Sequence, residues 1–230
     1  TSIGKYAFKD CSNLASIEIP EGVTSIGGCA FQDCSNLASI EIPNSVTSIG
    51  IVAFGSCTSL TSINIPEGVT SIGGSAFSGC TNLIDITIPE SVTSIGASAF
   101  YDTPWLTNKR QENNSLVIVN GILIDGRTCS GEVTIPDGVT NIGEKAFYDC
   151  SSMTSISIPK SVTSIGDYAF FMCSNLESIE IPSSVTSIGE STFSYTPWLT
   201  NKQNESPLVI VNGILIDGTT CSGEVTIPDG

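Results

Sequence analysis

The sequence predicts a repeat solenoid, a mainly β rod in which one short motif forms each coil. Three observations support this fold class. A phenylalanine recurs at Phe8, Phe31, Phe54, Phe77, Phe100, Phe147, Phe170 and Phe193. The residue before it is alanine in every copy except the last, where Thr192 precedes Phe193. An Ile-Pro pair follows the same period of 23 residues, with its proline at Pro20, Pro43, Pro66, Pro89, Pro136, Pro159, Pro182 and Pro228. Only two intervals depart from this repeat, and they closely resemble each other.

Each unit begins with an extended segment whose apolar residues alternate with polar ones. Leu14, Ile17 and Ile19 follow the pattern L-x-x-I-x-I, which places both isoleucines on the inward face of a strand. The intervening Ser16 and Glu18 then point outward. A single strand of this kind cannot bury its apolar face alone, so we expect it to stack on its neighbours in a parallel sheet. The proline that follows has no N–H for a sheet and ends the strand.

The second half of each unit predicts a shorter strand and a compact corner. Residues 23–26 are rich in β-branched side chains and suit a short strand, and Gly27 follows where we expect a left-handed backbone. The apolar positions of residues 30–34 fit one helical turn, which we expect to be 3₁₀ and to bury Ala, Phe and Cys. The phenylalanines should therefore form a column inside the rod.

Six of the nine cysteines occupy one repeat position and are expected to extend this core as a ladder: Cys11, Cys34, Cys57, Cys80, Cys150 and Cys173. Side chains on parallel neighbours point the same way, which disfavours disulfides between them, and metal-type spacing is absent. A buried row of free thiols is therefore the favoured interpretation, with disulfides or a metal site as alternatives. Cys29, Cys129 and Cys221 lie off this row, where any of them could be a reactive thiol or simply a variable residue.

The two altered coils lie near residues 101–131 and 194–223. In the first, the polar run 107–115 is expected to bulge out as a loop. Residues 116–119 and 122–124 should be strands, joined at Asn120-Gly121, which is a strong signal for a two-residue hairpin. Repeats vary where something protrudes, so these coils are candidates for a binding edge.

The only two tryptophans, Trp105 and Trp198, occupy equivalent positions in the altered coils, each after a proline. One interpretation is an exposed aromatic platform for a sugar or a protein. The other, which we favour, is a structural plug that covers the place of the missing Ala-Phe corner.

Composition excludes several classes of function. Charged residues make up 13% of the chain against a usual share of about 25%, and the net charge is −15. Such a surface repels nucleic acid and anionic membranes, and favours cationic protein patches or divalent cations. No apolar run is long enough for membrane insertion. The absence of histidine excludes Ser-His and Cys-His nucleophile pairs and the usual zinc sites. We therefore expect no enzymatic activity, cofactor or metal, although calcium on stacked carboxylates remains an alternative.

The unit L-x-x-I-x-I-P-x-x-V-T-S-I-G-x-x-A-F-x-x-C resembles the BspA-like class of leucine-rich repeats over almost the whole chain. The resemblance implies a right-handed leucine-rich-repeat coil from a bacterial cell-surface or secreted protein that serves adhesion and protein binding. It transfers no catalytic residue. Residues 1–230 are then interpreted as a single solenoid of about ten coils, which is a fragment of a longer exported protein. The two ends of this fragment are expected to lack polar capping coils. We expect partial exposure of Ile3 and Ile227, and end-to-end self-association.

Three functions fit these observations. The first is a scaffold that binds an extracellular-matrix or cell-surface protein, the second a structural spacer within a longer surface protein. The third is a carbohydrate-binding module that uses the two tryptophans, with a glycan as ligand. The weak candidates for ligand contact are Trp105, Trp198, Glu18, Glu41 and Glu180. Glu18 and Glu41 are chosen because stacking would bring these outward carboxylates next to each other.

Overall fold

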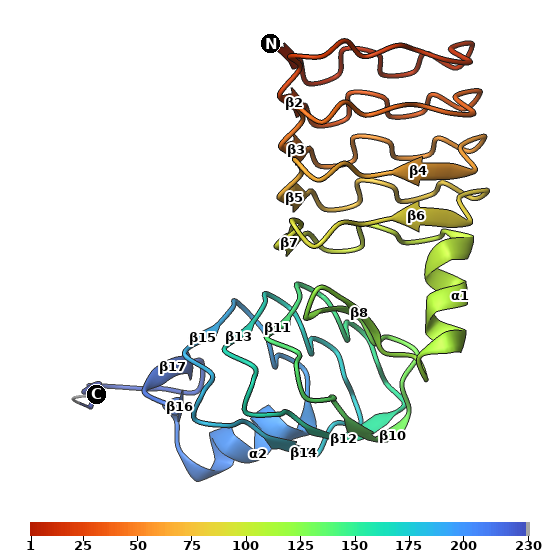
Figure 1. Ribbon diagram of the computed structural model, residues 1–230. Coiled ribbons are helices and arrows are strands. Elements are labelled where there is room, and N and C mark those ends of the chain that lie inside the picture. Colours follow the sequence, from red (N-terminus) through yellow and green to blue (C-terminus); the bar gives the residue numbers. More distant parts are fainter. Residues whose placement is uncertain (229–230) are drawn as a thin grey trace. The chain divides into compact units, whose positions relative to one another are not determined.

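The computed structural model describes residues 1–228, which form two compact units, one of residues Thr1–Asn113 and a second that begins at Asn114. Each unit is a stack of coils, as the ribbon in Figure 1 shows. The predicted solenoid architecture is therefore confirmed, and the units are described in turn.

In the first unit, the short second strands pair in parallel to form one sheet. Their order is β1 (Ser2–Ile3), β2 (Ser25–Ile26), β3 (Ser48–Ile49), β5 (Ser71–Ile72) and β7 (Ser94–Ile95). The register advances by one repeat at each step, so that Ile26 pairs with Ile49 and Ile49 with Ile72. All three of these isoleucines are buried. Residues that pair in the sheet are therefore one sequence period, 23 residues, apart.

The longer extended segments line another side of the same coils. β4 (Ser62–Asn64) and β6 (Asp85–Thr87) pair in parallel, with Ile63 opposite Ile86. Both isoleucines are buried, whereas the residues beside them are exposed. We call the outward residues of these segments the strand face of the first unit: Ser16, Glu18, Ser39, Glu41, Ser62, Asn64, Asp85 and Thr87.

The second unit repeats this plan after an antiparallel hairpin of β8 (Val117–Val119) and β9 (Ile122–Asp125). Asn120 and Gly121 at its tip both have positive φ, 49° and 75°, as the predicted two-residue turn requires. β9 then begins a parallel sheet with β11 (Asn141–Ile142), β13 (Ser164–Ile165) and β15 (Ser187–Ile188). The longer strands are β10 (Gly131–Thr134), β12 (Met153–Ser157) and β14 (Ser178–Glu180), and a second hairpin follows in β16 (Val209–Val211) and β17 (Ile214–Asp217).

The phenylalanines form one buried column in each unit. In the first, consecutive rings from Phe8 to Phe100 are stacked with centroids 5.2–5.8 Å apart. In the second, Phe147, Phe170 and Phe193 stack at 5.1 and 5.7 Å. In each column the amide N–H of every phenylalanine before the last donates to the next coil, as Phe31 does to the Ala53 carbonyl at 2.7 Å. Ring stacking and backbone bonding therefore share the same register.

The corner that carries each phenylalanine is a pair of tight turns without a continuous 3₁₀ helix. Ala30 N–H donates to the Gly27 carbonyl, and Cys34 N–H to the Phe31 carbonyl, both at 3.2 Å. At the third residue of each turn the backbone is left-handed, at Cys29 (φ 55°) and at Asp33 (φ 60°), which interrupts any helix.

The expectation of a left-handed Gly27 is wrong, because its φ is not positive. Glycine is needed there for close packing: an added Cβ would lie 2.7 Å from the backbone nitrogen of Lys5 in the preceding coil.

The altered coils contain helices where a polar loop was expected, and that expectation is corrected. α1 (Pro104–Glu112) and α2 (Pro197–Glu205) are nine-residue α-helices. Thr103 caps α1, because its hydroxyl accepts a hydrogen bond from Leu106 N–H at 3.2 Å, and Pro104 occupies the first helical turn, where its missing N–H costs nothing. Thr196 caps α2 in the same way.

Ile3 is half-buried and Ile227 is 63% exposed, in agreement with the partial exposure expected from the sequence.

Candidate functional site

The strand face of the first unit is polar and exposed over its whole length. Its eight side chains, defined above, are all exposed, whereas the isoleucines between them point into the coil. Pairing of β4 with β6 places Ser62 opposite Asp85 and Asn64 opposite Thr87. The face therefore presents hydroxyl, amide and carboxylate groups at regular intervals, an arrangement suited to hydrogen bonding with a partner surface.

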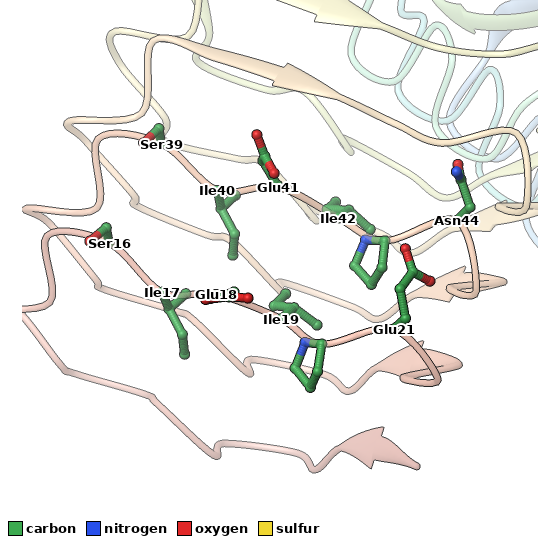
Figure 2. A pocket seen from close by; sticks show the side chains of 12 residues that line it. Ser16, Ile17, Glu18, Ile19, Glu21, Ser39, Ile40, Glu41, Ile42 and Asn44 are labelled. Atoms are coloured by element: carbon green, nitrogen blue, oxygen red, sulfur yellow. The ribbon is translucent and has the colours of Figure 1, made fainter.

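A depression of about 670 Å³ lies on this face between two neighbouring coils. It is lined by residues Ser16 to Glu21 of one coil and Ser39 to Asn44 of the next. Figure 2 shows the two segments running side by side, with Glu41 on the side opposite to Ile40 and Ile42. Glu18 and Glu41, predicted from the sequence to be neighbours, thus both line one depression.

The main chain of this depression is unusually open. Among the described residues, the segments 15–20 and 38–43 share one backbone hydrogen bond, from Ala38 N–H to the Ala15 carbonyl at 3.3 Å. By contrast, β4 and β6 form a regular parallel pair on the same face. The peptide groups of the first two segments therefore lack most of the hydrogen bonds that pair β4 with β6.

The depression is anionic, because its lining includes Glu18, Glu21 and Glu41 and no lysine or arginine. Within residues 1–228, no group of three or more histidine, cysteine, aspartate or glutamate side chains is placed to hold a metal ion. A cationic group of a ligand is the counterpart that this charge favours.

In the second unit, the equivalent outward residues also pair in register. Glu132 lies opposite Ser155, and Ser157 opposite Glu180. Glu180, the third selected carboxylate, is exposed on β14.

The two tryptophans are buried, which corrects the interpretation of a surface platform. Trp105 is 6% exposed and Trp198 is 7% exposed. The ring of Trp105 lies 4.7 Å from that of Phe100, tilted by 54°, and Trp198 contacts Phe193 with nearly the same geometry. Each indole thus packs against the last phenylalanine of a column, as the plug interpretation requires, and offers no face to a sugar.

The cysteine row is a ladder of free thiols that bond from coil to coil. All described cysteines are free, and five of the six in the row are buried, the exposed one being Cys11 in the first coil. Each buried Sγ donates to a carbonyl in the preceding coil, as Cys57 does to Phe31 at 3.1 Å. Burial raises the pKa of the Cys173 thiol to about 12 and that of Cys150 to about 11. These thiols remain protonated and unreactive at neutral pH.

The three cysteines outside the row differ from one another. Cys129 is buried, and its burial raises the pKa of the thiol to about 12, which makes it a poor nucleophile. Cys29 and Cys221 are half-buried. Of the three, Cys29 and Cys221 are therefore accessible enough to react, and Cys129 is not.

Sequence reasoning missed a group of surface aromatics in the second unit. The rings of Tyr148, Tyr168 and Tyr195 each contact the ring of Phe171 at the corner of the coils. These residues occupy variable positions on either side of the repeated phenylalanine, where most coils of the first unit, apart from Tyr6 and Tyr101, carry no aromatic residue. That difference between repeats is the signal that could have identified them.

No helix in the described part of the chain has the length and apolar character needed to span a membrane.

Comparison with known proteins identifies a family. The model of BspA type leucine-rich repeat regions matches residues 1–122 and 127–228, in six copies. No curated protein matches the chain.

Three solved structures are similar to parts of the chain. A leucine-rich repeat protein from Bacteroides ovatus is 28% identical over 85% of this chain and 62% of its own, with a TM-score of 0.48. A leucine-rich repeat protein from T. pallidum is 26% identical over 89% of this chain and 86% of its own, with a TM-score of 0.44. A leucine rich cell surface protein from Faecalibacterium prausnitzii is 34% identical over 78% of this chain and 44% of its own, with a TM-score of 0.41. The chain thus spans less than two thirds of the Bacteroides ovatus protein.

Proposed function

The chain belongs to the BspA type leucine-rich repeat family, and on that premise we propose that it is a non-catalytic scaffold that binds a protein through its strand face. Leucine-rich repeat proteins generally bind proteins and are generally not catalysts. The observation that carries the proposal is the strand face itself, a row of exposed polar side chains held in register by the coils beneath. The partner is an extracellular-matrix or cell-surface protein, and the chain acts outside the cell or at its surface.

The composition of the strand face supports a protein partner. The peptide groups of residues 16–19 and 39–42, between which no backbone hydrogen bond forms, offer main-chain hydrogen bonds, and Glu18 and Glu41 offer counterions for basic side chains. Ile84 adds an apolar contact, because it is 61% exposed directly before Asp85 of β6. An apolar anchor within a polar surface is a common arrangement in protein interfaces.

The experiment is a binding screen of the 230-residue chain against purified extracellular-matrix proteins, followed by variants of the strand face. For any protein that binds, the triple variant Glu18→Gln, Glu41→Gln, Asp85→Asn should weaken binding at least about fivefold, and Ile84→Ser should do the same. The control Glu67→Gln, Glu90→Gln, Asp137→Asn removes the same number of charges from exposed turn positions. Its affinity should stay within about twofold of the parent chain.

Equal losses in the strand-face variant and in the control would mean that net charge, and not this surface, determines binding. Absence of binding throughout a broad screen would instead favour the structural spacer.

A further inference from the structure

The corner of the second unit carries an aromatic cluster in which Tyr195 is exposed and Tyr148, Tyr168 and Phe171 are half-buried. Tyr148 stacks on Phe171 with ring centroids 5.3 Å apart, and Tyr168 and Tyr195 meet the edges of Phe171 at 5.5 and 5.1 Å. Tyr195 is 70% exposed, and the adjoining Met172 is 42% exposed. We call these five residues the aromatic corner.

A column of carboxylates borders the aromatic corner. Glu144, Asp167 and Glu190 each follow the glycine that ends a short second strand, and all three are exposed. Main-chain bonds hold them beside the cluster, from Lys145 N–H to the Asp167 carbonyl at 3.0 Å and from Tyr168 N–H to the Glu190 carbonyl at 2.9 Å. Asp149, directly after Tyr148, is also exposed.

The first unit builds the same corner with only part of this set: Tyr6 occupies the position of Tyr168, Tyr101 that of Tyr148 and Phe171, and Asp10, Asp33 and Asp102 that of Asp149. The positions of the three carboxylates are occupied there by Lys5, Gly28, Ile51, Gly74 and Ala97. The positions of Tyr148 and Phe171 are occupied by Lys9, Gln32, Gly55, Ser78 and Tyr101. The column of carboxylates beside these rings is therefore a feature of the second unit, and a coil forms without it.

The corner already shows the kind of group it accepts. The ammonium nitrogen of Lys145 lies 5.7 Å from the centroid of the Tyr168 ring and 3.8 Å from a carboxylate oxygen of Glu144. An aromatic face attracts a cation, and a nearby carboxylate adds to that attraction. Lys145 is the one cation in this set of residues, against the four carboxylates of Glu144, Asp149, Asp167 and Glu190. Most of the negative charge at the corner is thus not neutralised within the set.

We propose that the aromatic corner is a second protein-binding surface, which takes an arginine- or lysine-rich segment of a partner. Guanidinium or ammonium groups lie against the rings of Tyr168, Phe171 and Tyr195, and the bordering carboxylates pair with their charge. The inference rests on the proposed role as a protein scaffold but uses a different surface. Its test uses neither the strand face nor a matrix protein, so either proposal can fail without the other.

The test is the fluorescence anisotropy of a labelled peptide of six Arg-Gly repeats, titrated with the 230-residue chain at low salt. The triple variant Tyr168→Ser, Phe171→Ser, Tyr195→Ser should weaken binding by about tenfold. Because Phe171 is half-buried, Tyr195→Ser is measured alone as well, and should weaken binding about threefold without altering the thermal unfolding curve. Tyr101→Ser, which removes an exposed tyrosine from the first unit, should leave binding unchanged.

The contribution of charge is tested by Glu144→Gln, Asp167→Asn, Glu190→Gln against the control Glu67→Gln, Glu90→Gln, Asp137→Asn. The corner variant should lose about tenfold in affinity and the control less than twofold. Equal losses in the two variants, or no peptide binding by the parent chain, would overturn the proposal. Binding of cellohexaose that depends on Tyr195, without peptide binding, would also overturn it and assign the corner to a glycan.

Discussion

The phenylalanine column makes the most specific prediction about stability, and Phe77 is the residue to change. Its ring is fully buried and stacks between Phe54 and Phe100, with centroids 5.3 and 5.8 Å away. Phe77→Ala removes a ring in contact with both neighbours, and the backbone on either side is fixed by hydrogen bonds to adjacent coils. The space that is left cannot close easily.

The expected loss in the free energy of unfolding is roughly 3–5 kcal/mol, the usual range for a core aromatic replaced by alanine. Phe8→Ala is the matched control, because Phe8 is half-buried and stacks on a single ring, Phe31, at 5.2 Å. With less buried area and one neighbour, it should cost about half as much or less.

The assay is urea unfolding followed by tryptophan fluorescence in a Trp198→Phe background, which leaves Trp105 as the only tryptophan. Trp105 is a suitable probe because its ring contacts Phe100, the next ring in the same column. If Phe77→Ala cost no more than Phe8→Ala, the idea that a continuous column of rings stabilises the first unit would be refuted.

Further predictions follow from single positions. Gly126→Ala should destabilise the second unit by about 1–3 kcal/mol in urea unfolding, because the new methyl would overlap the ring of Phe147, and an unchanged midpoint would contradict that packing. Thr103→Ala should cost about 1–2 kcal/mol, because it removes the cap of α1, whereas Thr107→Ala on the exposed side of the same helix should cost less. Iodoacetamide at pH 8 should label Cys11 and leave Cys173 unlabelled, and labelling of Cys173 in the folded chain would exclude a buried ladder. Because burial raises the pKa of Cys173 from 9.0 to about 12, the folded state holds its proton more tightly than the unfolded state, so stability should fall as pH rises from about 9 to 12.

The repeat predicts the core well, because periodic apolar residues leave few ways to pack. Once Ile26, Ile49 and Ile72 must all point inward at one spacing, stacking in register is the arrangement that buries each of them. The hairpin at Asn120-Gly121 could be predicted for a local reason, since few residue pairs tolerate two consecutive positive φ angles.

The helices α1 and α2 could not be found from apolar periodicity, because their sequences are polar on most sides. The sequence nevertheless contains a signal for the start of each helix, a threonine N-cap followed by proline, at Thr103-Pro104 and Thr196-Pro197. Burial of Trp105 and Leu106 on the coil beneath explains why so polar a segment is helical.

The candidate site was predicted in part. Glu18 and Glu41 could be placed side by side because neighbouring coils bring equivalent residues together, but the open main chain between them depends on a local departure from strand pairing. The aromatic corner was missed because its residues occupy positions that vary from repeat to repeat. The repeat pattern does not indicate that the rings of Tyr168 and Tyr195 both contact that of Phe171, which the structure shows.

The central claim is that each 23-residue unit is one coil, held in register with the next. The direct test is NMR detection of scalar couplings across backbone hydrogen bonds in the deuterated chain. We expect couplings from Phe54 N–H to the Ala76 carbonyl and from Phe77 N–H to the Ala99 carbonyl, for which the N···O distances are 2.8 and 2.7 Å. Couplings from these amides to other carbonyls, or rapid exchange of both amides with solvent, would contradict the coil register.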